Sequence, residues 1–292
     1  MISIIIASTS KSLLNDISEN INETVGVAFE IISFNNAQGE KGLCELYNTG
    51  ARMAKYDVLC YMHEDINIRT KDWGRIVTDA FKDNSNLGLV GIAGSVYKAI
   101  SPSGWHSNSE NTERTNIIQT FKFSNKREMH HIRNPLNEKF SKVSCIDGVW
   151  FSTLKKIVLE NPFDEETFKG FHAYDIDFSL QVGRKYDVNV RFDILLQHFS
   201  EGNFDKNWML EVIKLHHKWN KILPIKTADF DIDNQLLIEK RTFKDFVDKA
   251  LKFGINKIEL LKLLWAKDGI YRHNFKLFLK LNRYLIGKVI KS

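Results

Sequence analysis

The residues of this chain most suited to chemistry are three polar side chains, His63, Glu64 and Asp65, which directly follow an apolar run. The run, Val58-Leu59-Cys60-Tyr61-Met62, has the length and composition of a buried strand in a parallel sheet. Ligands of open α/β sheets bind just beyond the carboxyl ends of such strands. Carboxylates and an imidazole at that place suit a divalent cation that in turn holds phosphate. A solvated strand end is the alternative interpretation.

The elements that must position these residues precede them in a regular order. Residues 2–9 form a β-branched run that breaks into small hydroxyl residues, and residues 29–36 form a second apolar run. Residues 43–54 carry apolar side chains at helical spacing, which predicts a helix before the strand at 58–62. The order strand, helix, strand, helix, strand is that of doubly wound nucleotide-binding sheets.

Several sequence blocks in this order resemble a known family. Gly42, Asn48, Gly50 and Ala54 lie on the segment before the strand, followed by His63-Glu64-Asp65. Later blocks are Trp73 with residues 87–91, Cys145–Phe151, Pro162–Glu165, Phe171–Leu180 and Gln197–Gly202. The chain resembles the family 2 glycosyltransferases, and most closely a branch in which a His-Glu-Asp motif stands in place of Asp-x-Asp.

The resemblance implies a fold and an activity. The implied fold is GT-A, a Rossmann-like mixed α/β sheet flanked by helices, here followed by a C-terminal helical extension. The implied enzyme is an inverting, metal-dependent glycosyltransferase that moves a sugar from a nucleotide-diphosphate donor to a hydroxyl. Its acceptor would be a bacterial cell-surface glycan (lipopolysaccharide, capsule or a related polymer) or a lipid-linked precursor.

Two other classes of function compete with this interpretation. A nucleotidyltransferase would need a Gly-rich loop with basic residues directly after the first strand, and residues 7–11 do not supply it. A non-catalytic relative that binds a nucleotide sugar or a glycan is the stronger alternative, because His63 and Tyr174 both replace carboxylates of the family motifs.

The resemblance also assigns the metal site, with Mn²⁺ or Mg²⁺ as the cation. Asp65 matches the second aspartate of the family motif and is the expected ligand. His63 replaces the first aspartate, and an imidazole is acceptable to Mn²⁺ but poor for Mg²⁺, so a contact with the donor's ribose or phosphate is the alternative. His198 follows residues 192–196, which predict a strand, and its family counterpart completes the metal site or contacts the diphosphate. Glu64 is expected at the donor site, in a direct or a supporting role.

Asp175 is the predicted general base. In the family pattern Glu-Asp-x-Asp, the aspartate after the glutamate deprotonates the acceptor hydroxyl, and here Tyr174 stands in place of that glutamate. Residues at i and i+2 of a helix do not share a face, so Asp175 and Asp177 cannot both face the sugar. Asp177 is expected to cap or brace the helix near its positive end. Two plain helix-terminal carboxylates are the alternative.

The donor is expected at the exits of the first two strands. Ser8 and Thr9 follow the first strand and Asn35 and Asn36 the second, where they should cradle the base and the ribose. The family usually has an aspartate at the second exit that reads uracil, so the identity of the base stays open. The other donor residues implied by the resemblance are Gly42, Asn48, Asp147 and Gly148. The Ser-rich segment 101–116 is predicted to be a mobile acceptor-side loop.

Charge divides the chain unevenly. The net charge is +5, but residues 240–292 hold 14 Lys and Arg against 4 Asp and Glu, and apolar side chains recur there at helical spacing. We expect a catalytic domain at 1–225 and a basic helical extension at 226–292, with a hinge at residues 223–233. The extension is expected to contact anionic lipid, to pack on the catalytic domain or to form a dimer. Nucleic acid is not an expected partner, since no recognition motif accompanies the lysines.

The expected location is the cytoplasm, with a peripheral contact on the inner face of the cytoplasmic membrane. Cys44, Cys60 and Cys145 lack metal-ligand spacing and are expected to be reduced core residues. The sequence has no apolar run long enough to span a bilayer, and its first residues lack the basic segment of a signal peptide.

Overall fold

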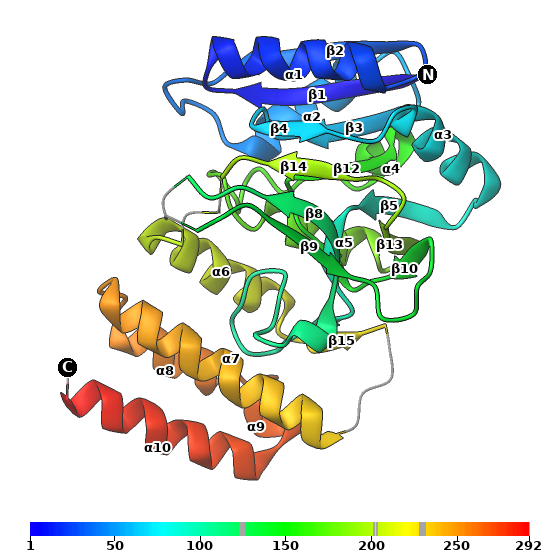
Figure 1. Cartoon of the computed structure of the whole chain (residues 1–292). Helices are drawn as coiled ribbons and strands as arrows, with labels where there is room; N and C mark the ends of the chain where they lie inside the picture. Colours follow the sequence, from blue (N-terminus) through cyan, green and yellow to red (C-terminus); the bar gives the residue numbers. More distant parts are fainter. Residues whose placement is uncertain (123–125, 201, 203, 228–231, 292) are drawn as a thin grey trace. The chain divides into compact units, whose positions relative to one another are not determined.

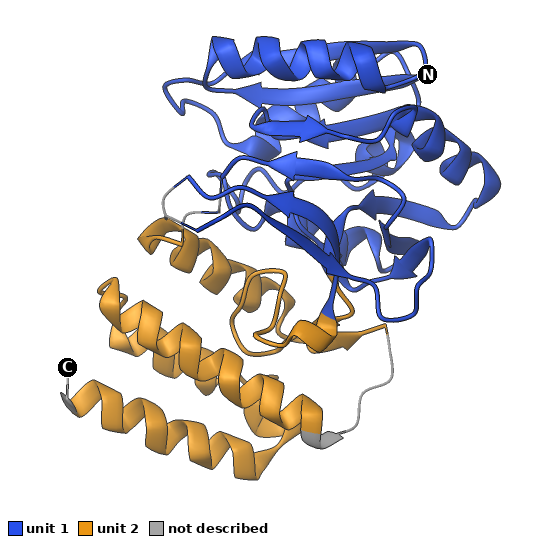
Figure 2. Ribbon diagram, viewed as in Figure 1, with its two compact units in different colours: residues 1–94, 113–202 blue, residues 95–112, 203–292 orange. Residues whose placement is uncertain are grey.

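The computed structural model describes the chain except for residues 123–125, 201, 203, 228–231 and 292. Figure 2 shows its two compact units: unit 1 contains residues 1–94 and 113–202, and unit 2 contains residues 95–112 and 203–292. This division differs from the expected domain boundary after residue 225. Unit 2 contains residues 95–112 and 203–225 in addition to the C-terminal segment. Residues 228–231 of the expected hinge lie outside the described residues.

Unit 1 is built on a seven-stranded mixed sheet with the order β10-β13-β5-β12-β3-β1-β2 (Figure 1). Its strands are β1 (Ile2–Ser8), β2 (Phe29–Asn35), β3 (Val58–Met62), β5 (Leu87–Gly91), β10 (Phe140–Lys142), β12 (Trp150–Leu154) and β13 (Asp187–Arg191). β1 pairs in parallel with β2 and β3, whereas β12 is antiparallel to β3 and β5. The strands predicted from the first three apolar runs are confirmed as β1, β2 and β3.

A second sheet in unit 1 has the order β11-β6-β8-β14-β4, with β9 paired to β8. Its strands are β4 (Ile66–Ile68), β6 (Ala93–Ser95), β8 (Glu113–Gln119), β9 (Met129–Arg133), β11 (Cys145–Ile146) and β14 (Leu196–His198). The prediction of a strand at 192–196 was wrong, since β14 begins only at Leu196. Arg191 and Asp193 pair across the bend that separates β13 from β14.

Helices cover both faces of the seven-stranded sheet. They are α1 (Lys11–Thr24), α2 (Leu43–Met53), α3 (Trp73–Asp83), α4 (Lys155–Glu160) and α5 (Tyr174–Val182). α1 and α3 pack on one face through a cluster that includes Ile17, Val77 and Val90. α2 and α5 pack on the other face, where Tyr47 and Phe178 meet the aromatic side chains of the sheet.

Unit 2 is mainly helical. It contains β7 (Tyr97–Lys98), the 3₁₀ helix η1 (Glu110–Thr112), α6 (Lys206–Trp219), β15 (Ile225–Lys226), α7 (Ile232–Lys252), α8 (Lys257–Leu264), α9 (Ile270–His273) and α10 (Phe275–Lys291). The apolar stripes predicted in residues 240–292 supply a core of their own, with Phe243, Val247, Leu281 and Leu285 buried. None of the described helices is long and apolar enough to cross a membrane.

The segment 101–116 that was predicted to be a mobile loop is instead packed within unit 2 up to residue 112, and its last residues belong to β8. Ser101 and Ser107 are fully buried. The Glu239 carboxylate of α7 accepts the backbone N–H groups of Ile100 and Ser101, at 3.0 Å and 2.8 Å. The prediction was wrong because serine is common in mobile loops, whereas here the serine hydroxyls satisfy buried polar groups.

Candidate functional site

His63, Asp65 and His198 come together at the C-terminal end of β3. The chain leaves β3 at Met62, and the antiparallel pairing of β14 with β4 sets His198 opposite Ile66, beside Asp65. One Asp65 carboxylate oxygen lies 3.9 Å from His63 Nδ1 and 3.6 Å from His198 Nε2. The ligand atoms of all three residues lie within 4.8 Å of one another.

This ligand set fits a divalent cation such as Mn²⁺. Atoms that share a cation at roughly 2.1 Å lie about 3–3.5 Å apart, so a small movement of the rings would complete the site. Burial favours the neutral form of Asp65, but His198 and His63 together lower its pKa below the usual range. Burial and the neighbouring His198 lower the pKa of His63. An ionised carboxylate beside a neutral imidazole is the protonation state that metal ligation requires.

Ser200 is a member of this cluster that the sequence did not single out. Its hydroxyl donates to the second Asp65 oxygen at 2.6 Å and lies 3.3 Å from His198 Nε2. The backbone N–H of Phe199 donates to the Asp65 carbonyl at 3.0 Å. The segment after β14 therefore orients Asp65 through both its side chain and its backbone. The sequence could have indicated Ser200, because the block that resembles the family runs from Gln197 to Gly202 and includes this residue.

Asp175 lies in the first turn of α5 beside a second carboxylate, Asp147. Burial and the negative charge of Asp147 raise the pKa of Asp175 to about 7. Asp147 accepts the backbone N–H of Val149 at 2.8 Å, which fixes its side chain at the turn before β12. Asp177 is fully buried within the helix, whereas Asp175 is half-buried. A carboxyl group with a pKa near 7 is suited to accept a proton at neutral pH.

Tyr174 connects the histidine of the first motif to the aspartate of the second. Its hydroxyl lies 3.3 Å from His63 Nε2 and donates to the Gly148 carbonyl at 3.2 Å. The two residues that replace family carboxylates, His63 and Tyr174, are thus in contact across 111 positions of the chain. Gly148 is required there, because a Cβ at this position would lie 2.1 Å from the Tyr174 hydroxyl oxygen.

Glu64 supports the loop after β1. Its carboxylate accepts the hydroxyls of Ser8 at 2.6 Å and Thr9 at 2.7 Å. It also accepts the backbone N–H groups of Thr9 at 2.9 Å and Ser10 at 3.3 Å. Ser8 and Glu64 are buried, whereas Thr9 is exposed. All three of these predicted donor residues therefore form hydrogen bonds that shape the loop, and of the three only Thr9 is exposed.

Four further predicted donor residues, Asn35, Asn36, Gly42 and Asn48, are in contact with other parts of the protein. The Asn36 side chain is paired with the backbone of Lys41, and the exposed Asn35 accepts the N–H of Ala37 at 3.2 Å. Both polar atoms of the Asn48 side chain bond to the backbone of Phe163. A Cβ on Gly42 would lie 2.7 Å from the backbone of Lys169, so this glycine allows a close approach of protein backbone. These contacts fix the backbone around the predicted donor site.

The sequence matches a known protein family over most of its length. The model of a glycosyltransferase-like family matches residues 3–219. The structure resembles that of GalNAc-T7 with UDP, GalNAc and Mn²⁺, with a TM-score of 0.52 and 10% identity over 90% of this chain and 54% of that one. It also resembles residues 1–349 of S. aureus TarS, with a TM-score of 0.47 and 12% identity over 91% of this chain and 75% of that one.

This chain spans about half the length of the GalNAc-T7 structure. No curated protein matches the sequence. At these identities the structural likeness establishes the fold, while the family match covers most of unit 1 and all of the site residues. The chain therefore belongs to the glycosyltransferase-like family and has the GT-A fold.

Proposed function

We propose that this enzyme transfers a sugar from a nucleotide-diphosphate donor to an acceptor hydroxyl in a metal-dependent, inverting reaction. The observation that carries the proposal is the placement of a cation ligand set and a carboxyl group of raised pKa near the same edge of the sheet. His63, Asp65 and His198 form the ligand set, and Asp175 is the carboxyl group. These are the two functions that a single displacement at an anomeric carbon needs.

The ligand set would hold Mn²⁺ or Mg²⁺ against the donor diphosphate. A divalent cation, when bound, stabilises the charge that develops on the departing diphosphate. The contact with Tyr174 supports His63 as a ligand, because the tyrosine hydroxyl donates to Gly148 and can accept only from a protonated Nε2. In that tautomer, Nδ1 of His63 is the free atom and faces Asp65.

Asp175 would act as the general base. Its ionised carboxylate takes the proton of the acceptor hydroxyl while the oxygen forms a bond to the anomeric carbon. The bond from that carbon to the diphosphate oxygen breaks on the opposite side, so the configuration is inverted. Asp147, which raises the pKa of Asp175, lies at the position that the family resemblance assigns to the donor sugar or acceptor.

The donor would lie along the ends of β1 and β2. Thr9 and Asn35 are exposed at these ends and are the residues we assign to the base and ribose. Asn36, Gly42 and Asn48 then act indirectly, by fixing the backbone around the site. The structure of GalNAc-T7 contains UDP, GalNAc and Mn²⁺, which supports a nucleotide-diphosphate sugar and a divalent cation here as well.

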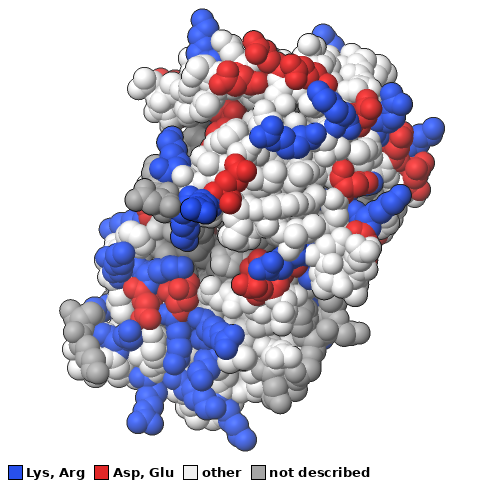
Figure 3. Space-filling view, in the orientation of Figure 1, with Lys and Arg blue, Asp and Glu red and all other residues white. Residues whose placement is uncertain are grey.

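The acceptor would be a bacterial cell-surface glycan or its lipid-linked precursor, as the family resemblance suggests. The enzyme would then work in the cytoplasm, at the inner face of the membrane. Figure 3 shows basic side chains gathered over the helices of unit 2. α10 adds a row of exposed apolar side chains, Phe275, Leu279, Ile286 and Ile290. Their spacing puts them on one side of the helix, which suits a contact with anionic lipid.

Donor hydrolysis tests the proposal. The full-length protein is incubated with a panel of nucleotide sugars and Mn²⁺, and free sugar is measured. We expect slow hydrolysis of one donor, which EDTA abolishes. Asp65→Asn should abolish it as well, because the cation loses its carboxylate ligand. Asp57→Asn, at an exposed aspartate before β3, is the matched control and should retain activity.

Two results would contradict parts of the proposal. Full hydrolysis in EDTA would show that the reaction does not need a metal. A cationic side chain would then have to neutralise the charge of the diphosphate. Binding of a nucleotide sugar without hydrolysis or transfer of any donor would instead identify a non-catalytic relative of the family.

A further inference from the structure

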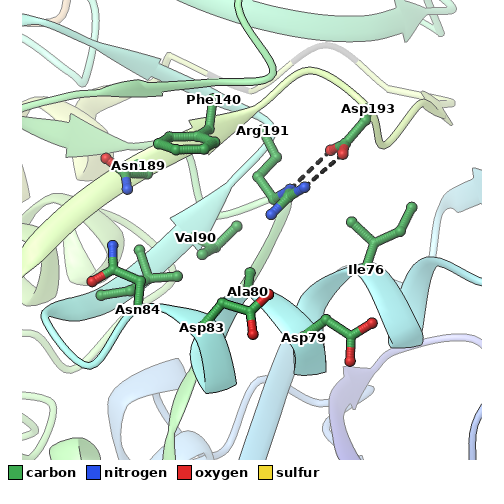
Figure 4. Close-up of a pocket in the computed structure, with 11 residues that line it drawn as sticks. Ile76, Asp79, Ala80, Asp83, Asn84, Val90, Phe140, Asn189, Arg191 and Asp193 are labelled. Atoms are coloured by element: carbon green, nitrogen blue, oxygen red, sulfur yellow. Dashed lines mark hydrogen bonds and ion pairs between the residues drawn. The ribbon is translucent and has the colours of Figure 1, made fainter.

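A cavity of 450 Å³ opens on unit 1, lined by α3, β5, β10 and β13 (Figure 4). It lies on the face of the sheet that α3 covers. Asn189 of β13 lines it, whereas the neighbouring Val188 faces the other side, against the end of α5. Since α5 carries Asp175, the cavity and the proposed general base lie on opposite faces of the sheet. The volume is within the roughly 300–1,000 Å³ of small-molecule sites.

Asn189 is a buried polar side chain that lacks a protein partner. Only 6% of the residue is exposed, and within the described chain its amide makes no hydrogen bond. An amide with so little access to water gains from a hydrogen-bond partner. A group that enters the cavity could supply that hydrogen bond.

Arg191 can donate a hydrogen bond into the cavity, and its charge is balanced by an ion pair with Asp193. Its side chain is 15% exposed, and it is paired with Asp193 through Nε at 2.8 Å and Nη2 at 2.5 Å. The other terminal nitrogen has no acceptor among the residues described. Figure 4 shows the guanidinium reaching into the cavity toward α3. The pairing balances the charge of Arg191, so the remaining nitrogen acts as an oriented neutral donor.

The opposite side of the cavity offers acceptors and an apolar wall. Asp79 and Asp83 project from one side of α3, are exposed and form no ion pair with any residue of the described chain. Phe140 of β10 is 52% exposed and closes the upper side in Figure 4. Ile76 and Val90 add apolar surface. The site therefore combines donors, acceptors and an aromatic face.

The charges select the class of ligand. Asp79 and Asp83 would repel an anion. A ring with several hydroxyls fits the polar groups of the cavity, because each hydroxyl can donate to a carboxylate or accept from the Asn189 amide. The C–H face of such a ring can pack on Phe140.

We propose that this cavity is a carbohydrate-binding subsite for a neutral sugar unit, separate from the donor site. Because the enzyme is a glycosyltransferase, the glycans it acts on are a source of such units. The subsite would retain a glycan on the protein between transfers without touching the reacting atoms. It depends on none of the residues assigned to the cation or to the general base.

The test uses ¹⁵N-labelled full-length protein and an array of neutral oligosaccharides built from glucose, galactose, N-acetylglucosamine and N-acetylgalactosamine. We expect at least one to shift the NMR signals of the Asn189 amide and the Arg191 Nε–H group. Phe140→Ala and Asn189→Leu should each weaken its binding at least tenfold. Leu159→Ala, at an exposed apolar residue of α4, is the matched control and should bind as wild type does.

Three results would overturn the proposal: no neutral oligosaccharide shifts the Asn189 signal, glucosamine or glucuronate shifts it more strongly, or all shifts cluster at His63 and Asp175. Donor hydrolysis is measured on the same samples. Phe140→Ala should hydrolyse the donor at the wild-type rate, since Phe140 lies outside the donor site. If wild type itself hydrolyses nothing, the proposed function fails while the NMR titration still decides the subsite.

Discussion

At the scale of single residues, the proposed mechanism uses two carboxylates whose pKa values lie far apart. Neighbouring imidazoles hold the pKa of Asp65 low, whereas burial and Asp147 raise the pKa of Asp175 to about 7. A pair of titratable groups whose surroundings separate their pKa values is typical of sites that divide charge stabilisation from proton transfer.

The first prediction concerns Asp175 and pH. The base must be ionised, so kcat should rise as the pH increases through about 7, where the carboxyl group loses its proton. Asp175→Asn should lower kcat by roughly a hundred- to ten-thousand-fold, as general-base loss does, with donor affinity unchanged. Steady-state kinetics and a nucleotide titration separate the two effects. A loss of donor affinity with unchanged kcat would make Asp175 a binding residue.

The second prediction concerns Tyr174. Tyr174→Phe removes the hydroxyl that holds His63 in the tautomer with Nδ1 free, so Mn²⁺ affinity should fall by roughly ten- to a hundred-fold. Electron paramagnetic resonance of free Mn²⁺ measures this without a turnover assay. Tyr61→Phe is the matched control, because the buried Tyr61 hydroxyl has no hydrogen-bond partner among the described residues. Equal Mn²⁺ affinity in Tyr174→Phe and wild type would refute the positioning role.

At the scale of elements, the start of α5 brings the two halves of the site together. α5 begins after Ala173, whose φ of 65° lies in the left-handed region that a residue with a Cβ seldom adopts. Tyr174 and Asp175 follow immediately and approach the turn between β11 and β12. This close approach depends on a glycine in that turn.

The third prediction tests this packing. Gly148→Ala would put a Cβ 2.1 Å from the Tyr174 hydroxyl oxygen and 3.1 Å from the Asp175 Cβ, so the start of α5 must move. We expect both Mn²⁺ affinity and kcat to fall, together with a lower Tm. Gly170→Ala is the control, since the described structure has no atom within 4 Å of a Cβ at that position. A Gly148→Ala protein with wild-type Mn²⁺ binding and kcat would show that α5 does not require the close contact.

At the scale of the whole molecule, charge and exposed apolar surface coincide in the C-terminal helices. Residues 240–292 carry ten more basic than acidic side chains. Around Phe278, the exposed aromatic residues Trp265, Tyr271 and Phe275 form a cluster with ring centroids 5.2–6.0 Å from it. Aromatic rings beside basic side chains are typical of helices that lie at a lipid surface.

The fourth prediction is that these helices bind anionic vesicles. Full-length protein should sediment with phosphatidylserine vesicles at low salt and be released by high salt, since each basic residue contributes about 1 kcal/mol that ions screen. The double variant Leu279→Gln/Ile286→Gln should stay in the supernatant. Leu136→Gln/Leu159→Gln removes equally exposed apolar residues of unit 1 and should bind normally. Wild type that remains in the supernatant at low salt would refute the membrane contact.

The sequence by itself determined the sheet, the family and the order of the motifs. Apolar runs with polar exits encode strands locally, so β1, β2 and β3 and the motif after β3 could be read from adjacent residues. The same local reading failed at residues 192–196 and in the Ser-rich segment 101–116. At residues 192–196 the chain bends, and Arg191 pairs with Asp193 across that bend. The Ser-rich segment is held by the carboxylate of Glu239, which is distant in the sequence.

Only the tertiary structure decided which polar side chains bond to the protein itself. Asn36 and Asn48 match the motif positions, yet their amides are used on protein backbone. The contact of His63 with Tyr174 depends on sheet register and on the approach of α5, neither of which nearby residues encode. Residue type and spacing specify what a side chain can do, but a hydrogen bond across more than a hundred positions forms only when the packed elements set its distance and direction.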